Sequence, residues 1–270
     1  MSKQMIIALA QMDLATGEKE RNLQKAAAWT ATAAHQGADL ILFPELWASG
    51  YDLKNSRELS QSRGEGAFAV MQELCESHQM MLGGSLLEFD AGEVFNTFAL
   101  YQPGQPPEYY RKIHLFRLLN EEAWLAPGNQ LVTVETQFGL IGLSICYDLR
   151  FPELFRAYAE AGACLVLLSA VWPRKRIIHW QKLLQARGIE NQFFLAAVNR
   201  VGSLEGEILG GSSTVINPLG EPLLEMNEEE GLLVAAVDLE EVQKTRRWMP
   251  VLEDRRRDLY KPPRDAANAK

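Results

Sequence analysis

The 270-residue sequence has few of the residues that usually mark a cofactor site, since it contains only three cysteines and four histidines. Cys75, Cys146 and Cys164 are widely spaced and form no C-x-x-C pair, which excludes a disulfide framework and a paired-cysteine zinc site. The motifs G-x-G-x-x-G, G-x-x-x-x-G-K-S/T and H-E-x-x-H are also absent, so the usual dinucleotide, phosphate and zinc-hydrolase signatures are missing. We therefore expect a protein that uses neither a metal nor an organic cofactor.

Positive charge is in the minority, and long hydrophobic runs are absent. The 27 lysines and arginines are outnumbered by 35 aspartates and glutamates, which gives a formal net charge of −8. Binding to nucleic acid or to an anionic membrane surface is not expected, because both normally need a basic surface. No run approaches the roughly 18 apolar residues of a membrane span, and the apolar run at residues 5–10 is too short for a signal peptide. Together with the few cysteines, these features predict a cytoplasmic location.

Apolar runs of strand length alternate with helical patterns along most of the chain, which is typical of a layered α/β domain. Several runs are apolar at successive positions, so we expect sheets that are covered on both faces. No linker or repeat divides the sequence, and we predict a single domain over residues 1–270 with a charged tail from about 249. Strands are predicted at residues 5–10, 39–43, 80–87, 94–101, 109–116, 131–134, 140–145, 164–168, 193–198, 212–216, 223–225 and 232–237. Helices are predicted at residues 18–35, 67–78, 152–161, 178–190 and 239–245.

Three of the predicted strands carry or end in reactive polar residues: Glu45, Lys112 and Cys146. Taken singly, each has an ordinary structural explanation as a capping glutamate, a surface lysine or a small core residue, which is also the role expected of Cys75 and Cys164. Functional sites of α/β sheets form at the carboxyl ends of strands. The shared position therefore favours one functional site that contains all three residues.

The three residue types are together sufficient for acyl transfer. A thiol with a pKa near 8.5 is only a few per cent ionised at pH 7, so Cys146 needs a nearby base or cation to become a useful nucleophile. Glu45 can take the thiol proton, and Lys112 can lower the thiol pKa and stabilise the oxyanion of a tetrahedral intermediate. A hydrolase that pairs Cys146 with His114 or His179 remains an alternative.

The sequence around these three residues resembles the nitrilase, or carbon–nitrogen hydrolase, superfamily. The resemblance is carried by FPEL at 43–46, RKIHLF at 111–116 and ICYDLRFPE at 145–153. It implies a four-layer α-β-β-α sandwich that pairs into a homodimer or a larger homo-oligomer. It also implies that Glu45 is the general base, Lys112 stabilises the tetrahedral intermediate and Cys146 is the nucleophile. The segment EEAWLAPG at 121–128 resembles the context of a second family glutamate, which spacing assigns to Glu121 rather than the adjacent Glu122.

Further segments are similar to the omega-amidase branch of the superfamily: HLFR at 114–117, VWP at 171–173, HW at 179–180 and ARGIENQ at 186–192. This similarity implies hydrolysis of the terminal amide of a small dicarboxylate monoamide, such as 2-oxoglutaramate or succinamate, through a thioester. The substrate carboxylate needs a cationic anchor, for which we select Arg150. Tyr51 and Trp172 are expected to line the pocket, and the backbone N–H of Tyr147 is expected to help bind the oxyanion.

Three alternatives remain beside this interpretation. The first is a hydrolase of N-carbamoyl amino acids or amines from the same superfamily. The second is a true nitrilase, although Tyr147 and Asp148 stand where nitrilases generally have Trp and Glu. The third is a binding protein that has the fold without turnover. The presence of all three candidate catalytic residues, Glu45, Lys112 and Cys146, argues against it.

Overall fold

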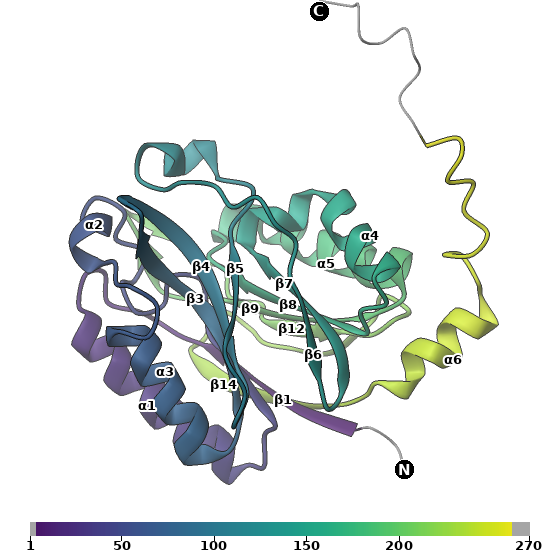
Figure 1. Ribbon diagram of the computed structural model, residues 1–270, viewed down its shortest axis with the longest axis horizontal. Helices are drawn as coiled ribbons and strands as arrows, with labels where there is room; N and C mark the ends of the chain where they lie inside the picture. Colours follow the sequence, from purple (N-terminus) through teal and green to yellow (C-terminus); the bar gives the residue numbers. More distant parts are fainter. Residues whose placement is uncertain (1–3, 261–270) are drawn as a thin grey trace, which may run out of the picture.

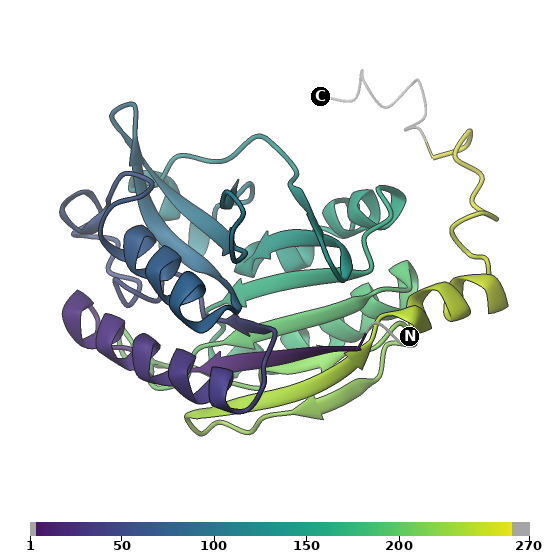
Figure 2. The ribbon, with the colours of Figure 1, turned by 60° about the horizontal axis from the view of Figure 1, so that its bottom comes forward.

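The computed structural model describes residues 4–260. Two six-stranded sheets lie face to face, and a pair of helices covers the outer face of each sheet, as Figures 1 and 2 show. The four layers confirm the predicted α-β-β-α sandwich.

The first sheet contains three parallel strands in its middle, and its other neighbouring strands are antiparallel. α1 (Lys19–His35) and α3 (Gly66–His78) pack on its outer face. Ile7 and Leu9 of β1 point into the core between the sheets, whereas Ala8 and Ala10 contact the helix side. The order of strands is β14 (Gly231–Asp238), β1 (Gln4–Gln11), β2 (Leu40–Leu42), β3 (Met81–Asp90), β4 (Glu93–Tyr101) and β5 (Glu108–Arg111).

The second sheet repeats this plan, with β7, β8 and β9 parallel. α4 (Pro152–Glu160) and α5 (Ile177–Asn191) cover its outer face. Every residue of β8 and β9 is buried, because one face meets the first sheet and the other meets these helices. The order is β13 (Pro222–Glu225), β12 (Thr214–Ile216), β9 (Phe194–Asn199), β8 (Leu165–Ala170), β7 (Gly139–Ile145) and β6 (Thr133–Thr136).

The strand predicted at 109–116 is wrong beyond Arg111, where β5 ends. The backbone N–H of His114 donates to Asp148 Oδ1 at 3.2 Å, and that of Phe116 donates to Glu121 Oε2 at 2.7 Å. Because these groups bind carboxylates, they are not available to a strand ladder.

Several short elements were not predicted from the sequence. They are α2 (Ser56–Leu59), the hairpin of β10 (Ser203–Leu204) and β11 (Glu207–Ile208), and the 3-10 turns η1 (Arg117–Leu119), η2 (Glu121–Ala123), η3 (Cys146–Arg150) and η4 (Arg174–Arg176). Each is at most five residues long, which is too short for an apolar period to be read from the sequence.

The last helix, α6 (Glu240–Trp248), extends beyond the sandwich, as Figure 1 shows. The charged segment that follows contacts the sandwich again, because Arg255 forms an ion pair with Glu160 at the end of α4. The remainder of the tail predicted from about 249, at residues 261–270, lies outside the described residues. Within residues 4–260, no helix combines the length and the apolar character needed to cross a membrane.

We predict that Gly142→Ala destabilises the fold. Gly142 lies on β7, and a Cβ there would come within 2.8 Å of the Tyr158 ring on α4. The overpacking should lower the free energy of unfolding by about 1–3 kcal/mol, measured by urea denaturation. Gly231→Ala is the matched control, because its Cβ would meet only the end of the flexible Met226 side chain. Equal stability of the two variants would contradict the packing argument.

Candidate active site

Two carboxylates and one ammonium group meet in the interior at one end of the sandwich. Lys112 Nζ donates to Glu45 Oε1 and to Glu121 Oε1, both at 2.7 Å. None of the three side chains is exposed to solvent. The structure thus brings together Glu45 and Lys112, which were expected from strand ends, and Glu121, which was expected from the segment EEAWLAPG.

Glu45 lies three residues after β2, in a turn that is fixed on both sides. Asn96 Nδ2 of β4 donates to Glu45 Oε1 at 2.8 Å. Leu46 has a positive φ of 47°, and its N–H donates to Ser85 Oγ of β3 at 2.9 Å. Glu45 Oε2 is buried and has no hydrogen-bond partner of ordinary geometry in the described part of the chain.

Glu121 is held by three donors. Besides Lys112, the Tyr51 hydroxyl donates to Oε1 and the Phe116 N–H donates to Oε2. The adjacent Glu122 is exposed, so Glu121 is the glutamate that lies beside Lys112. The Tyr51 hydroxyl is held by this buried carboxylate, and Tyr51 is not among the residues that line the pocket around Cys146. A contact between Tyr51 and the substrate stays a prediction.

Cys146 directly follows β7 and begins η3. Its φ is +46°, a strained value for a residue with a side chain. The thiol is 6% exposed, and its Sγ donates to Val171 O at 3.7 Å.

Asp148 holds the turn that carries Cys146. It is fully buried, and it accepts hydrogen bonds from Ile145 N at 2.9 Å, Tyr110 Oη at 2.7 Å and His114 N at 3.2 Å. His114 Nδ1 also lies 2.7 Å from Asp148 Oδ1. Asp148 is not among the site residues predicted from the sequence, although its position two residues after the candidate nucleophile was a usable signal.

Burial and neighbouring charges have opposing effects on the pKa values of Glu45 and Lys112. Burial is the main cause that raises the pKa of Glu45 to about 7, and the charge of Lys112 opposes it. Burial disfavours the charged form of Lys112, but Glu121 and Glu45 together hold its pKa above the ordinary value. Burial and the Glu45 charge raise the pKa of the Cys146 thiol well above its usual range. The resting site therefore holds a neutral thiol, an ammonium group and a carboxylate that can exchange a proton near neutral pH.

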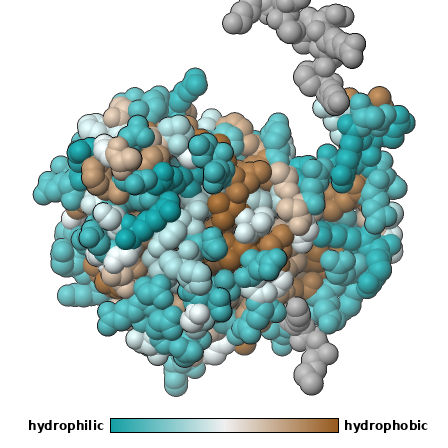
Figure 3. Space-filling view, viewed as in Figure 1, coloured by the Kyte–Doolittle hydropathy of each residue, from teal (hydrophilic) through white to brown (hydrophobic). Residues whose placement is uncertain are grey.

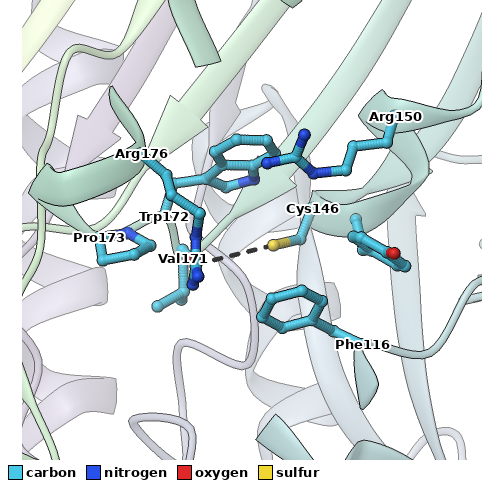
Figure 4. Close-up of a pocket in the computed structure, with 8 residues that line it drawn as sticks. Phe116, Cys146, Arg150, Val171, Trp172, Pro173 and Arg176 are labelled. Atoms are coloured by element: carbon cyan, nitrogen blue, oxygen red, sulfur yellow. Dashed lines mark hydrogen bonds between the residues drawn. The ribbon is translucent and has the colours of Figure 1, made fainter. Parts of the chain in front are cut away.

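A narrow pocket opens over the thiol. Figure 4 shows Arg150 and Arg176 beside Cys146, with Trp172 and Phe116 completing the walls. The lining residues are Phe116, Cys146, Tyr147, Arg150, Val171, Trp172, Pro173 and Arg176. On the face of the molecule drawn in Figure 3, apolar side chains gather in a strip down the middle and hydrophilic ones cover the flanks.

Three of the four residues expected to bind substrate, Tyr147, Arg150 and Trp172, line this pocket. Arg150 has no carboxylate within ion-pair distance in the described chain, and its guanidinium lies 4.7 Å from the Trp172 ring centre. Arg176 also lines the pocket and was missed. The signal for it was the basic run of residues 174–176 between Pro173 and a helix.

The remaining candidates lie away from the thiol. His114 pairs with Asp148, and the exposed His179 lies 3.4 Å from Arg150 Nη2. Neither histidine hydrogen-bonds to Cys146 in the described structure, so the cysteine–histidine alternative lacks geometric support. Cys75 lies on the buried face of α3 and packs into the core between the helices and the first sheet, as expected. Residues 4–260 contain no group of three or more His, Cys, Asp or Glu side chains arranged to hold a metal ion.

Comparison with known proteins agrees with this geometry. The carbon-nitrogen hydrolase family model matches residues 6–247. The chain is 37% identical over 260 residues to the 2-oxoglutaramate amidase of Bacillus subtilis (strain 168), covering 94% of this chain and 98% of that protein. It is 32% identical over 265 residues to the omega-amidase NIT2 of Homo sapiens, covering 94% and 96% of the two chains.

A solved structure adds chemical detail for a relative. An amidase variant from Nesterenkonia sp. AN1 matches with a TM-score of 0.84 and 30% identity, covering 96% of this chain and 95% of that one. That structure contains the acetamide moiety of fluoroacetamide added covalently at the active-site cysteine. With a family model that spans most of its length and full-length relatives above 30% identity, the present chain belongs to the carbon–nitrogen hydrolase family, and it is an amidase of the nitrilase superfamily.

Proposed function

We propose that this amidase hydrolyses the terminal amide of a small dicarboxylate monoamide, such as 2-oxoglutaramate or succinamate, to the dicarboxylic acid and ammonia. The observation that carries the proposal is the composition of the pocket, which is lined by both the Cys146 thiol and the guanidinium group of Arg150. Arg150 lacks a carboxylate partner within residues 4–260, so it is available to bind the far carboxylate of a substrate. The name of the Bacillus subtilis relative, 2-oxoglutaramate amidase, agrees with this substrate class.

The first half of the reaction forms a thioester. Glu45 takes the Cys146 proton, and the thiolate attacks the amide carbon to give a tetrahedral intermediate. Lys112 and the backbone N–H of Tyr147 stabilise the oxyanion, and one such donor is typically worth about 10²–10³ in rate. The C–N bond then breaks as Glu45 returns its proton to the nitrogen, and ammonia leaves.

The second half releases the acid. A water molecule loses a proton to a glutamate of the site and attacks the thioester carbon. The C–S bond breaks, the proton passes to the thiolate, and the free thiol is regenerated. Glu121 holds Lys112 in position through both halves, because it accepts one of the two hydrogen bonds from the ammonium group.

We also propose that the protein is a cytoplasmic homodimer, or a larger homo-oligomer, in which the helical layers of two sandwiches stack. Its α5 helix exposes Ile178 and Ile189, which are 61% and 55% accessible. Exposed apolar side chains on one helix face fit burial against a second copy.

The substrate class is tested by measuring ammonia release from 2-oxoglutaramate, succinamate, glutamine, asparagine, N-carbamoyl amino acids and simple nitriles. We expect turnover of the two dicarboxylate monoamides and none by Cys146→Ala. Turnover of a carbamoyl compound or a nitrile, without turnover of any monoamide, would reject the proposed substrate.

Neighbouring glutamates provide a matched pair of variants. Glu121→Gln should lower kcat by about 10²–10⁴, the range for loss of a positioned acid–base group, because Lys112 loses one of its two anionic partners. Glu122→Gln should leave kcat near the normal value, because Glu122 is exposed. Steady-state kinetics on succinamate, with circular dichroism to check folding, measures both. Similar kcat values for the two variants would remove Glu121 from the site.

The raised pKa of Glu45 predicts the pH profile. Below about pH 7 the carboxyl group keeps its proton and cannot accept one from Cys146. We therefore expect kcat/KM to rise with pH through a midpoint near 7 rather than near the ordinary value of 4.5. His114→Asn should leave this midpoint in place, because His114 is not hydrogen-bonded to Glu45. A midpoint that disappears in His114→Asn would assign the titration to the histidine instead.

A further inference from the structure

The basic run Arg174, Lys175 and Arg176 forms the single turn η4 at the mouth of the pocket. Two of its three cations have carboxylate partners. Arg174 Nη2 lies 2.5 Å from Glu228 Oε2, and Lys175 Nζ lies 2.6 Å from Glu207 Oε1. Arg176 has no carboxylate within ion-pair distance in the described part of the chain, and it is the member of the run that lines the pocket.

Arg176 and Arg150 are arranged in the same way. The Arg176 guanidinium lies 5.1 Å from the Phe116 ring centre, and that of Arg150 lies 4.7 Å from the Trp172 ring centre. A guanidinium group that lies over an aromatic ring keeps the N–H donors at its edge free to bind a carboxylate. Both side chains are half-buried, which strengthens their interaction with an anion relative to a fully solvated cation.

The two cations also influence one another. Burial is the main cause that lowers the pKa of Arg150, and the charge of Arg176 adds to it. Two like charges that share a small pocket without an anion disfavour each other. A bound carboxylate between them would relieve this repulsion and bind two planar donor groups at once.

We infer that Arg176 and Arg150 together bind the far carboxylate of the substrate, and that Arg176 makes the enzyme select acids over neutral amides of the same shape. This inference rests on the proposed function and extends it. It assigns to Arg176 a specificity role that concerns the non-reacting end of the substrate, whereas Lys112 and Cys146 act on the reacting amide.

The test compares succinamate with succinamide, which replaces the carboxylate by a neutral amide of the same shape. In Arg176→Gln, we expect kcat/KM for succinamate to fall about 10- to 100-fold, the loss typical of a hydrogen bond to a charged group, with a change below about threefold for succinamide. Arg176→Lys should recover part of the preference for succinamate, because it restores the charge without the planar fork.

Arg174→Gln is the matched control. It removes a guanidinium group from the same turn, but that group pairs with Glu228 and does not line the pocket, so the preference for succinamate should be retained. An equal fall on both substrates in Arg176→Gln would overturn the inference and indicate a structural role. An unchanged preference would overturn it too, because another group would then recognise the carboxylate.

A binding measurement separates this inference from the proposed reaction. In the Cys146→Ala protein, succinate binding is measured by calorimetry with and without the additional Arg176→Gln change. Succinate binding that weakens at least about tenfold with the second change supports the carboxylate site, even if no monoamide is hydrolysed and the proposed reaction fails. Succinate affinity that is independent of Arg176 overturns the inference, whatever the enzyme hydrolyses.

Discussion

The site depends on one buried cation, Lys112, that lies between two buried carboxylates. Removing three charges from water is costly and is compensated only when their hydrogen bonds are well formed. Asn96, Tyr51 and the Phe116 N–H satisfy the other contacts of Glu45 and Glu121. The exception is Glu45 Oε2, and the Cys146 thiol is near enough to this carboxylate to lower its pKa. The network thus leaves accepting capacity on the carboxylate that is proposed to receive the thiol proton.

A separate network holds Cys146. Asp148 accepts hydrogen bonds from Tyr110 of β5 and Ile145 of β7, so it links the two sheets at the turn where Cys146 takes its positive φ. A strained backbone persists only where its surroundings determine it fully. Glu45 follows β2 of the first sheet and Cys146 follows β7 of the second, so the packing between the sheets sets their separation.

The sequence predicts a site from Glu45, Lys112 and Cys146, because a strand end and a short motif are both local features. Spacing selects Glu121 over Glu122, and Glu121 is the buried one of the two. The sequence does not show that the Tyr51 hydroxyl donates to the buried Glu121, because this contact joins residues that are far apart in the chain. The sequence also does not distinguish Arg176 from its neighbours. Three consecutive basic residues look alike in sequence, and only the fold decides that Glu228 and Glu207 pair with the first two.

These ion pairs matter for substrate binding, because the protein has a net charge of −8. An acidic protein repels an acidic substrate at long range, but salt screens that repulsion beyond about 8–10 Å. Recognition of an anion must then come from cations at short range that are not already neutralised. Many arginines and lysines of residues 4–260 are paired with carboxylates, including Arg63, Arg111, Lys112 and Arg187. Arg150 and Arg176 are not so paired, and both lie beside the thiol. An acidic chain can therefore present a positive pocket because nearby cations are neutralised by its glutamates while these two are left for the ligand.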